Sequence, residues 1–391
     1  MRDAARLPRT VWLLGFTSLF MDMSSELVHS LLPLFLVAGL GASAFTVGLI
    51  DGLAEATASA TRIFSGAFSD WWRHRKWLAV FGYGLSALTK PLFPLAAGAG
   101  PVLAARLLDR LGKGIRGAPR DALLADVTPA ELRGAAYGLR QALDSVGALV
   151  GPLLATVLMW LLAGDIRAVL WLACVPAVLA VLVLAVGVPE PPMARDGPRR
   201  FPLRRRELQR LGGEFWLFIA AGLLLLLPRF SEAFMLLRGS DTGLAAAYVP
   251  LVLAAMSLPY ALTAAPAGRL SDRLSRRRLV LAGFVVLAAA HLVFALAPSP
   301  WLVFAGAGLW GLHMGLTQGV LSALVADHAP ADLRGTAFGA FHLMSGLAML
   351  AGSVGAGWLW DLFGAAPMFA GAAGMTLLGV AAFAALPRGL K

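Results

Sequence analysis

The sequence has one cysteine and little charge. Cys174 stands alone within an apolar run, which excludes an internal disulfide and a cysteine-rich metal site. Charged residues make up only 14% of the chain, whereas a soluble domain carries about 25%. Runs of about ten residues that alternate in hydrophobicity are lacking, which argues against a membrane β-barrel. We expect no cleaved signal peptide, because the first apolar stretch is too long for a signal core and contains Asp22 and Glu26.

Long apolar runs take the place of charge. Hydrophobic residues make up 59% of the 391 residues, and short arginine-rich or Gly- and Pro-containing gaps separate the runs. This pattern is typical of a polytopic helical membrane protein. We predict an all-α fold with twelve spans, at residues 11–38, 45–69, 77–98, 101–125, 134–162, 165–188, 214–238, 244–270, 279–298, 300–326, 335–362 and 365–387.

Positive charge exceeds negative charge, with 33 Lys and Arg against 22 Asp and Glu. In a soluble protein the net charge of +11 would suggest a nucleic-acid partner. Here the cations gather in alternate short connections, while those at 39–44, 98–101, 298–300 and 363–365 carry no charge. The positive-inside rule therefore predicts that both termini are cytoplasmic. We expect no nucleic-acid partner.

The two halves of the chain repeat one another. LADVTPAELRGAAYG at residues 124–138 matches LVADHAPADLRGTAFG at residues 324–339. The offset stays close to two hundred residues, so a six-span unit is duplicated, and paired repeats are a transporter architecture. The predicted parts are a six-helix bundle at 1–188, a cytoplasmic linker at 189–213 and a second six-helix bundle at 214–391.

Span 4 carries a stripe of positive charge. The spacings of four, three, three and four residues between its cations are helical, so all five lie along one face. Charged groups at membrane depth are costly and face a bundle interior or a watery cavity, which indicates a functional role. The stripe consists of Arg106, Arg110, Lys113, Arg116 and Arg120, with Asp109 and Asp121 beside it.

Two loop motifs resemble those of the major facilitator superfamily. Gly66-Ala-Phe-Ser-Asp70-Trp-Trp-Arg-His-Arg-Lys76 and Gly268-Arg-Leu-Ser-Asp272-Arg-Leu-Ser-Arg-Arg-Arg278 are similar to the family pattern Gly-x-x-x-Asp-Arg-x-Gly-Arg-Arg/Lys, which follows spans 2 and 8. Trp71 replaces the arginine of the pattern in the first copy. The resemblance implies that Asp70 and Asp272 act in a cytoplasmic charge relay.

Spans 4 and 5 carry two further resemblances. Arg110-Leu-Gly-Lys113-Gly114 is similar to the family signature Arg-x-x-Gln-Gly, with lysine in place of glutamine. In the family the arginine of this signature is associated with proton transfer. Gly147-x-x-x-Gly151-Pro152-x-x-Ala155 resembles a span-5 motif found chiefly in exporters that exchange substrate for protons. Ordinary helix packing is the alternative, because two glycines on one face allow close approach and proline bends a helix.

Span 1 carries Asp22, Glu26 and His29 on one helix face. An unpaired ion in hydrocarbon costs at least about 2.5–3.5 kcal/mol, so these groups need partners. They either form a fixed network with the span-4 cations, or Asp22 or Glu26 exchanges a proton as the protein alternates its opening. Other charged or polar residues within the spans are Asp51, Glu55, Arg62, Arg140, Gln141 and Asp144.

Superfamily architecture implies that spans 1, 4, 7 and 10 surround a central cavity. The predicted substrate cavity consists of His29, Arg106, Arg110, Lys113, Arg229, Glu232, His313 and Gln318, with His342 as a further candidate. The predicted cytoplasmic gate consists of Asp70, Arg116, Arg120, Asp126, Arg133, Asp272, Asp327 and Arg334. We expect no metal site, because the His and Met residues show no converging spacing.

These features predict a secondary transporter that exports a small molecule in exchange for protons. The net-positive cavity favours a substrate with an anionic group, because a buried arginine matches carboxylate or phosphate. Proton-coupled uptake of an organic anion and multidrug efflux are the alternatives. An enzyme or scaffold is disfavoured, since nucleophile, zinc and phosphate-loop patterns are lacking. We expect a monomer in the bacterial inner membrane that needs the proton gradient and no cofactor.

Overall fold

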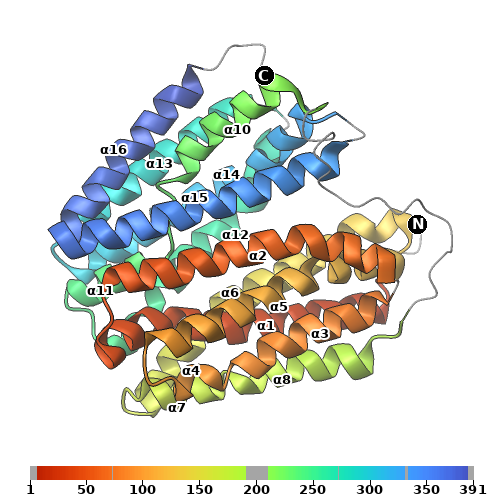
Figure 1. Cartoon of the computed structure of the whole chain (residues 1–391), viewed down its shortest axis with the longest axis horizontal. Coiled ribbons are helices and arrows are strands. Elements are labelled where there is room, and N and C mark those ends of the chain that lie inside the picture. The colour runs from red at the N-terminus through yellow and green to blue at the C-terminus, as the bar shows by residue number, and fades with distance from the viewer. Residues whose placement is uncertain (1–6, 73, 191–209, 272, 331–332, 386–391) are drawn as a thin grey trace, which may run out of the picture. The chain divides into compact units, whose positions relative to one another are not determined.

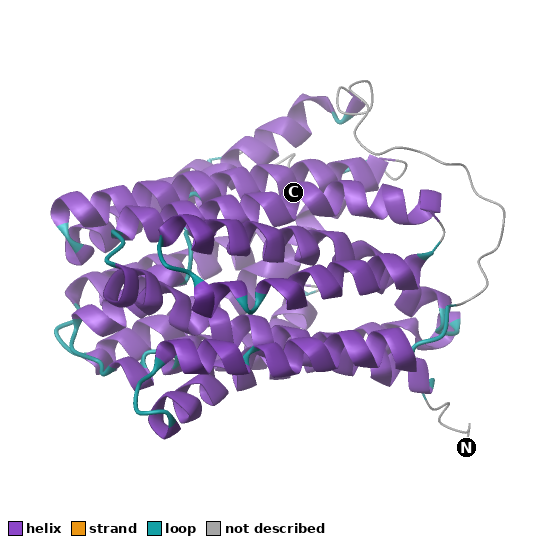
Figure 2. Cartoon of the chain, turned by 60° about the horizontal axis from the view of Figure 1, so that its bottom comes forward, coloured by secondary structure: helices purple, strands orange, loops and turns teal. Residues whose placement is uncertain are grey.

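The computed structural model describes residues 7–72, 74–190, 210–271, 273–330 and 333–385. Within these ranges the chain is helical, with loops and turns and no strand (Figure 2). The all-α class is therefore confirmed. Residues 191–209 of the predicted linker and Asp272 of the predicted gate lie outside the described residues, as do the side chains of Asp70 and Arg334.

Nine helical stretches of the described residues are long and apolar enough to cross a membrane. Three of the twelve predicted spans fall outside this group. Two of them form long helices, α2 (Ala44–Trp72) and α5 (Ala99–Asp126), which carry charged residues along their length, and the third, at 214–238, forms two shorter helices. The spanning stretches are Arg9–Gly39, Arg75–Leu95, Ala130–Leu161, Ile166–Gly187, Ala246–Ser271, Arg276–Leu296, Pro300–His328, Thr336–Phe363 and Ala365–Ala384.

Contacts between Cα atoms divide the chain into two compact units. The first unit comprises Met1–Leu31 and Thr57–Phe201, and the second comprises Leu32–Ala56 and Pro202–Lys391. The α2 helix is divided between them, with residues 44–56 in the second unit and 57–72 in the first. Besides α5, the helices of the first unit are α1 (Arg9–Leu34), whose last turn enters the second unit, α3 (Arg75–Thr89), α4 (Leu92–Leu95), α6 (Arg133–Leu161), α7 (Ile166–Leu172) and α8 (Cys174–Leu182). Those of the second are α10 (Gly212–Leu226), α11 (Ala233–Asp241), α12 (Leu251–Ser271), α13 (Arg276–Leu296), α14 (Pro300–His328), α15 (Arg334–Phe363) and α16 (Ala365–Ala384).

In the first unit α5 packs along α3, and α3 also packs against α8 (Figure 1). Small residues allow the close approach of α5. A Cβ atom on Gly112 would lie 2.6 Å from the Gly82 carbonyl oxygen, and one on Gly114 would lie 2.5 Å from the Cβ of Thr61 on α2. Close packing through small residues is how helices associate where lipid removes the hydrophobic driving force. It fixes the face that α5 turns toward its neighbours.

In the second unit α14 packs against both α12 and α13, and α13 also packs against α16 (Figure 1). Gly283 of α13 lies directly against Thr317 of α14, and Gly315 of α14 lies against Thr263 of α12. Gly283 and Gly315 follow Gly82 and Gly114 by about two hundred residues. The close contacts of the first unit therefore recur at the positions that the sequence repeat pairs.

The predicted span at 214–238 forms two helices, with a break at residues 227–232 between α10 and α11. Pro228 explains the break, because proline lacks the N–H that continues a helix and disfavours the helical conformation of the residue before it. Irregular backbone at membrane depth is tolerated only where protein or a watery cavity covers it. The break is covered accordingly, since Pro228, Phe230 and Ser231 are buried and Arg229 and Glu232 are half-buried.

Candidate functional site

The cations of α5 lie at the centre of the first unit's polar network. Arg106, Arg110 and Arg116 are buried, and Lys113 and Arg120 are half-buried. The helix carries Pro119 near its end and runs without interruption from Ala99 to Asp126, so the spacing of the cations in sequence becomes one face in space. Each buried guanidinium then needs a partner from a neighbouring helix.

Arg106 contacts His29 of α1. Its Nη2 lies 2.6 Å from His29 Nδ1, and both side chains are buried. A guanidinium can only donate hydrogen bonds, so Nδ1 accepts and the ring proton of a neutral His29 lies on Nε2. The contact joins two residues of the predicted cavity and couples the α5 stripe to the acidic face of α1.

Lys90 and Asp109 form a buried ion pair that the sequence analysis missed. Lys90 Nζ lies 3.0 Å from Asp109 Oδ1, and the two side chains are 1% and 3% exposed. Lys90 Nζ also donates to Ser25 Oγ of α1, at 3.3 Å. The available signal was a lone lysine inside the apolar run predicted to be span 3. The pair supplies one carboxylate to a region otherwise rich in arginine.

Arg116 is held by polar neutral groups on α3. Its Nη1 donates to Ser86 Oγ at 2.5 Å, and its guanidinium lies 4.7 Å from the centre of the Tyr83 ring. Ser86 Oγ in turn donates to the Asp109 carbonyl oxygen at 3.1 Å. Because none of these partners carries a negative charge, Arg116 keeps its positive charge uncompensated by these contacts.

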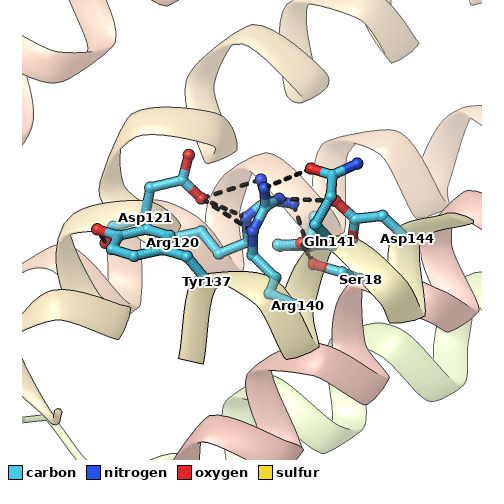
Figure 3. Close-up of polar contacts among 8 residues, drawn as sticks. Ser18, Arg120, Asp121, Tyr137, Arg140, Gln141 and Asp144 are labelled. Carbon is cyan, nitrogen blue, oxygen red and sulfur yellow. Dashed lines mark hydrogen bonds and ion pairs between the residues drawn. The ribbon is translucent and has the colours of Figure 1, made fainter. Parts of the chain in front are cut away.

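Arg120 belongs to a second cluster, where α5 meets α6 (Figure 3). It donates to Asp121 Oδ1 and to Ser18 Oγ of α1, each at 3.0 Å. Arg140 of α6 pairs with Asp144 at 2.6 Å and lies 3.8 Å from Asp121. Arg120 and Arg140 are thus matched by two carboxylates. This cluster is balanced in charge.

The span-5 glycines lie directly against the acidic face of α1. A Cβ on Gly147 would lie 3.2 Å from Asp22 Cβ, and a Cβ on Gly151 would lie 2.8 Å from Glu26 Cβ. Gly147, Gly151 and the adjoining Pro152 are all buried. The motif therefore determines how closely α6 approaches the two carboxylates predicted to carry protons.

The helix break of the second unit gathers another set of charged groups. Asp51 of α2 is buried, and its Oδ2 accepts a hydrogen bond from Ser231 Oγ at 2.7 Å. Glu232 lies within electrostatic range of Arg229, Asp51 and Glu55. Arg229 and Glu232, both predicted cavity residues, therefore lie together. Asp51 and Glu55, which the sequence placed only in a general network, join them.

The two remaining cavity candidates lie on α14. His313 is fully buried, with Nδ1 2.9 Å from the Gly283 carbonyl oxygen and its ring edge-on to Phe284. Gln318 is half-buried and accepts a hydrogen bond from Tyr260 of α12 at 3.0 Å. His313 thus has the surroundings of a packed side chain, whereas Gln318 belongs to a polar contact between helices. Tyr260 gave no signal in the sequence.

Residues predicted for the cytoplasmic gate pair within each unit. Asp126 accepts from Arg75 at 2.6 Å, and Asp327 pairs with Arg276. Arg75 and Arg276 belong to the two loop motifs, so the same ion pair recurs about two hundred residues later. Arg133 is exposed. Among the described residues, no group of three or more His, Cys, Asp or Glu could hold a metal ion.

Comparison with known sequences identifies relatives along nearly the whole chain. The sequence profile of the Major Facilitator Superfamily matches residues 14–237 and 233–389. An MFS-type transporter of Methanocaldococcus jannaschii is 32% identical over 362 residues, which cover 91% of this chain and 89% of that protein. The multidrug resistance protein MdtH of Yersinia pestis is 25% identical over 363 residues, covering 90% and 86%.

Solved structures share the fold at low sequence identity. The nucleoside transporter NupG has a TM-score of 0.80 at 13% identity, covering 97% of this chain and 99% of that one. The human organic anion transporter MFSD10 has a TM-score of 0.63 at 18% identity, covering 96% and 99%. At these identities the likeness concerns the fold alone.

Proposed function

The chain belongs to the major facilitator superfamily of multi-pass membrane transporters, and we propose that it exports a small molecule with an anionic group in exchange for protons. It works by alternating access, with two six-helix bundles of twelve spans in all. The recurrence of the ion pairs Arg75–Asp126 and Arg276–Asp327 supports the duplicated architecture.

The observation that carries the proposal is a surplus of buried positive charge in the first unit. Among the described residues of this unit, Lys76, Lys90, Arg106, Arg110 and Arg116 are buried, and Asp109 is the one buried carboxylate. The half-buried groups beside them, Lys113 against Asp22 and Glu26, leave the sum positive. A net positive charge at membrane depth attracts an anionic group. A substrate carboxylate or phosphate supplies one.

Proton coupling is supported by the surroundings of Asp22 and Glu26. Both carboxylates lie on the α1 face that α6 approaches through Gly147 and Gly151, and Asp22 is within electrostatic range of Asp144. A proton taken up by either carboxylate would raise the positive surplus nearby and so raise the affinity for an anion, which links proton and anion binding and by itself does not distinguish uptake from exchange. We therefore assign the coupling role to this pair.

Two alternatives to export of an anion in exchange for protons are each supported by a specific observation. The name of MdtH, a relative at 25% identity, favours multidrug efflux. The positive surplus is equally compatible with proton-coupled uptake of an organic anion, because it bears on the charge of the substrate and not on the direction of transport. We propose that the chain is no enzyme, that it is a monomer in the bacterial inner membrane with cytoplasmic termini, and that the proton gradient is its energy source.

Thermal stabilisation of the purified protein tests the proposed substrate class. Organic anions and lipophilic cations are added in separate panels at two pH values, since a ligand that binds only the folded state raises the midpoint. We expect stabilisation by an anion and its loss in Arg110→Ala and Lys113→Ala, with a smaller loss in Arg120→Ala, whose charge Asp121 compensates. Stabilisation by cations alone would reject the anionic substrate and favour multidrug efflux. Anion flux into proteoliposomes driven by a pH gradient then reports coupling.

A further inference from the structure

The first turn of α2 takes two of its hydrogen-bond acceptors from α15. The carboxylate of Asp361 accepts from the backbone N–H groups of Ala44 and Phe45, each at 3.0 Å. Ser43 accepts from the next two N–H groups, through its Oγ for Thr46 and its carbonyl oxygen for Val47. The first four N–H groups of a helix have no partner within the helix. Here all four are satisfied, half of them by a residue more than three hundred positions away.

The same two helices are packed tightly below this cap. Gly48 lies directly against the Ser353 carbonyl oxygen, and a Cβ on Gly52 would lie 3.0 Å from the Leu350 Cα. From the other side, a Cβ on Gly357 would lie 2.6 Å from the Ala44 carbonyl oxygen. The contact therefore runs along successive turns of α2 and α15 without room for a side chain, and Asp361 closes its end.

We propose that Asp361 is a releasable latch that holds α2 and α15 together on the side predicted to face away from the cytoplasm. The inference rests on the proposed alternating-access function, in which the two six-helix halves separate at one side at a time. By sequence, α2 belongs to the first half and α15 to the second, so a bond between them must break when that side opens. A carboxylate on a helix N-terminus suits this role, because it adds charge–dipole attraction without a buried counterion.

The surroundings of Asp361 allow the bond to open and close. Asp361 is exposed, whereas Val47, one turn into α2, is 1% exposed. A pocket of about 340 Å³ lies beside the cap and is lined by Ser43, Trp360 and Asp361 among others. Water therefore reaches the carboxylate and can replace its partners, while the packed turns beneath stay dry. Release of the cap is the first step that exposes Val47.

The rate at which a maleimide labels a Val47→Cys thiol tests the latch. The measurement uses the full-length protein in detergent, where both faces are accessible, in a Cys174→Ser background. We expect Asp361→Ala to raise the rate about fivefold, the usual effect of losing a helix cap on an equilibrium constant. Asp361→Asn should give a rate between those of the parent and Asp361→Ala, because the amide keeps one acceptor oxygen but loses the second acceptor and the charge.

Asp165 provides the matched control. It caps α7 from the adjoining residue, with its side chain accepting from the Ala168 N–H at 3.1 Å, so Asp165→Ala removes a cap that joins no separate helices. An equal rise in Asp165→Ala, or no rise in Asp361→Ala, overturns the latch. Gly357→Ala forces the same helices apart without touching the carboxylate and should also raise the rate. If Asp361→Ala does not fold, the labelling rate of Gly357→Ala tests the latch in its place, and an unchanged rate in that variant overturns it.

The labelling rate needs no substrate and no proton gradient. If labelling changes as expected but no proton-driven flux is seen, the latch is supported and the proposed coupling is rejected. If flux is seen but labelling is the same in Asp361→Ala as in the parent, the proposed function is supported and the latch is rejected.

Discussion

At the scale of single residues, the buried ion pair of Lys90 and Asp109 shows how the first unit tolerates charge. Removing one member leaves the other buried without compensation, which typically costs about 3–5 kcal/mol. We expect Lys90→Met to lower the thermal midpoint strongly and Lys90→Met with Asp109→Leu to recover most of the loss. Thermal unfolding of Lys90→Met, Asp109→Leu and the double variant measures this coupling. A loss in the double variant equal to the sum of the two single losses would mean that the residues contribute independently and not as a pair.

Asp22 and Glu26 carry the prediction about coupling. Neutralising Glu26 to Gln or Asp22 to Asn should abolish proton-driven flux while the protein still inserts and elutes as a single species. The reason is that an amide keeps the size and hydrogen-bonding capacity of the carboxyl group but cannot exchange a proton. Flux in proteoliposomes with an imposed pH gradient provides the measurement. Full activity in both variants would remove the assignment.

The sequence could identify those functional residues that recur at helical spacing. Spacing placed Arg106, Arg110 and Arg116 on one face of α5, and the structure buries all three. It could not name their partners, because a helical period defines a face and not the helix that covers it. Lys90 was missed for a related reason, since a lone lysine makes no periodic pattern. Tyr260 was missed because a tyrosine in an apolar run is unremarkable in composition.

At the scale of helices, the hydrophobic pattern predicts where helices lie but not where a helix is interrupted or which helix it packs against. Apolar runs identified every helix that qualifies as a span, whereas the break between α10 and α11 depends on one residue, Pro228, that the hydrophobic pattern passes over. The glycines of α6 were recognised from a motif. That they lie against Asp22 and Glu26 became visible only in three dimensions.

The contact between α1 and α6 yields a prediction about these glycines. Gly151→Ala places a methyl group 2.8 Å from Glu26 Cβ and from the Met23 carbonyl oxygen, so the helices must separate or α1 must shift. Overpacking of this kind typically costs about 1–3 kcal/mol. We expect a lower thermal midpoint and reduced proton-driven flux.

Gly138 lies on the same helix and provides the control. Nothing lies within 4 Å of a Cβ at this position, so Gly138→Ala should keep full flux. Its free energy of unfolding should rise by about 1 kcal/mol, because alanine has a higher helix propensity than glycine. If both glycine variants behaved alike, helix propensity rather than contact with α1 would account for the effect of Gly151→Ala.

At the scale of the whole molecule, the repeated ion pairs separate a structural role from a gating role. Arg75–Asp126 lies in the first unit and Arg276–Asp327 in the second, and all four side chains are partly exposed. Exposed pairs contribute up to about 1 kcal/mol each, and effects at distant independent sites add. The thermal midpoints of Asp126→Asn, Asp327→Asn and the double variant should therefore fall slightly and additively.

Transport by the same three variants answers a different question. If the two aspartates act in one cytoplasmic gate, as the loop-motif resemblance implies, either substitution already disables the shared step. The double variant should then lose little more flux than the single variants, although its loss of stability is the sum of theirs. Proteoliposome flux and thermal unfolding of the same preparations make the comparison. Additivity in both would show that each pair only braces its own unit, and the gate would have to be assigned to other residues.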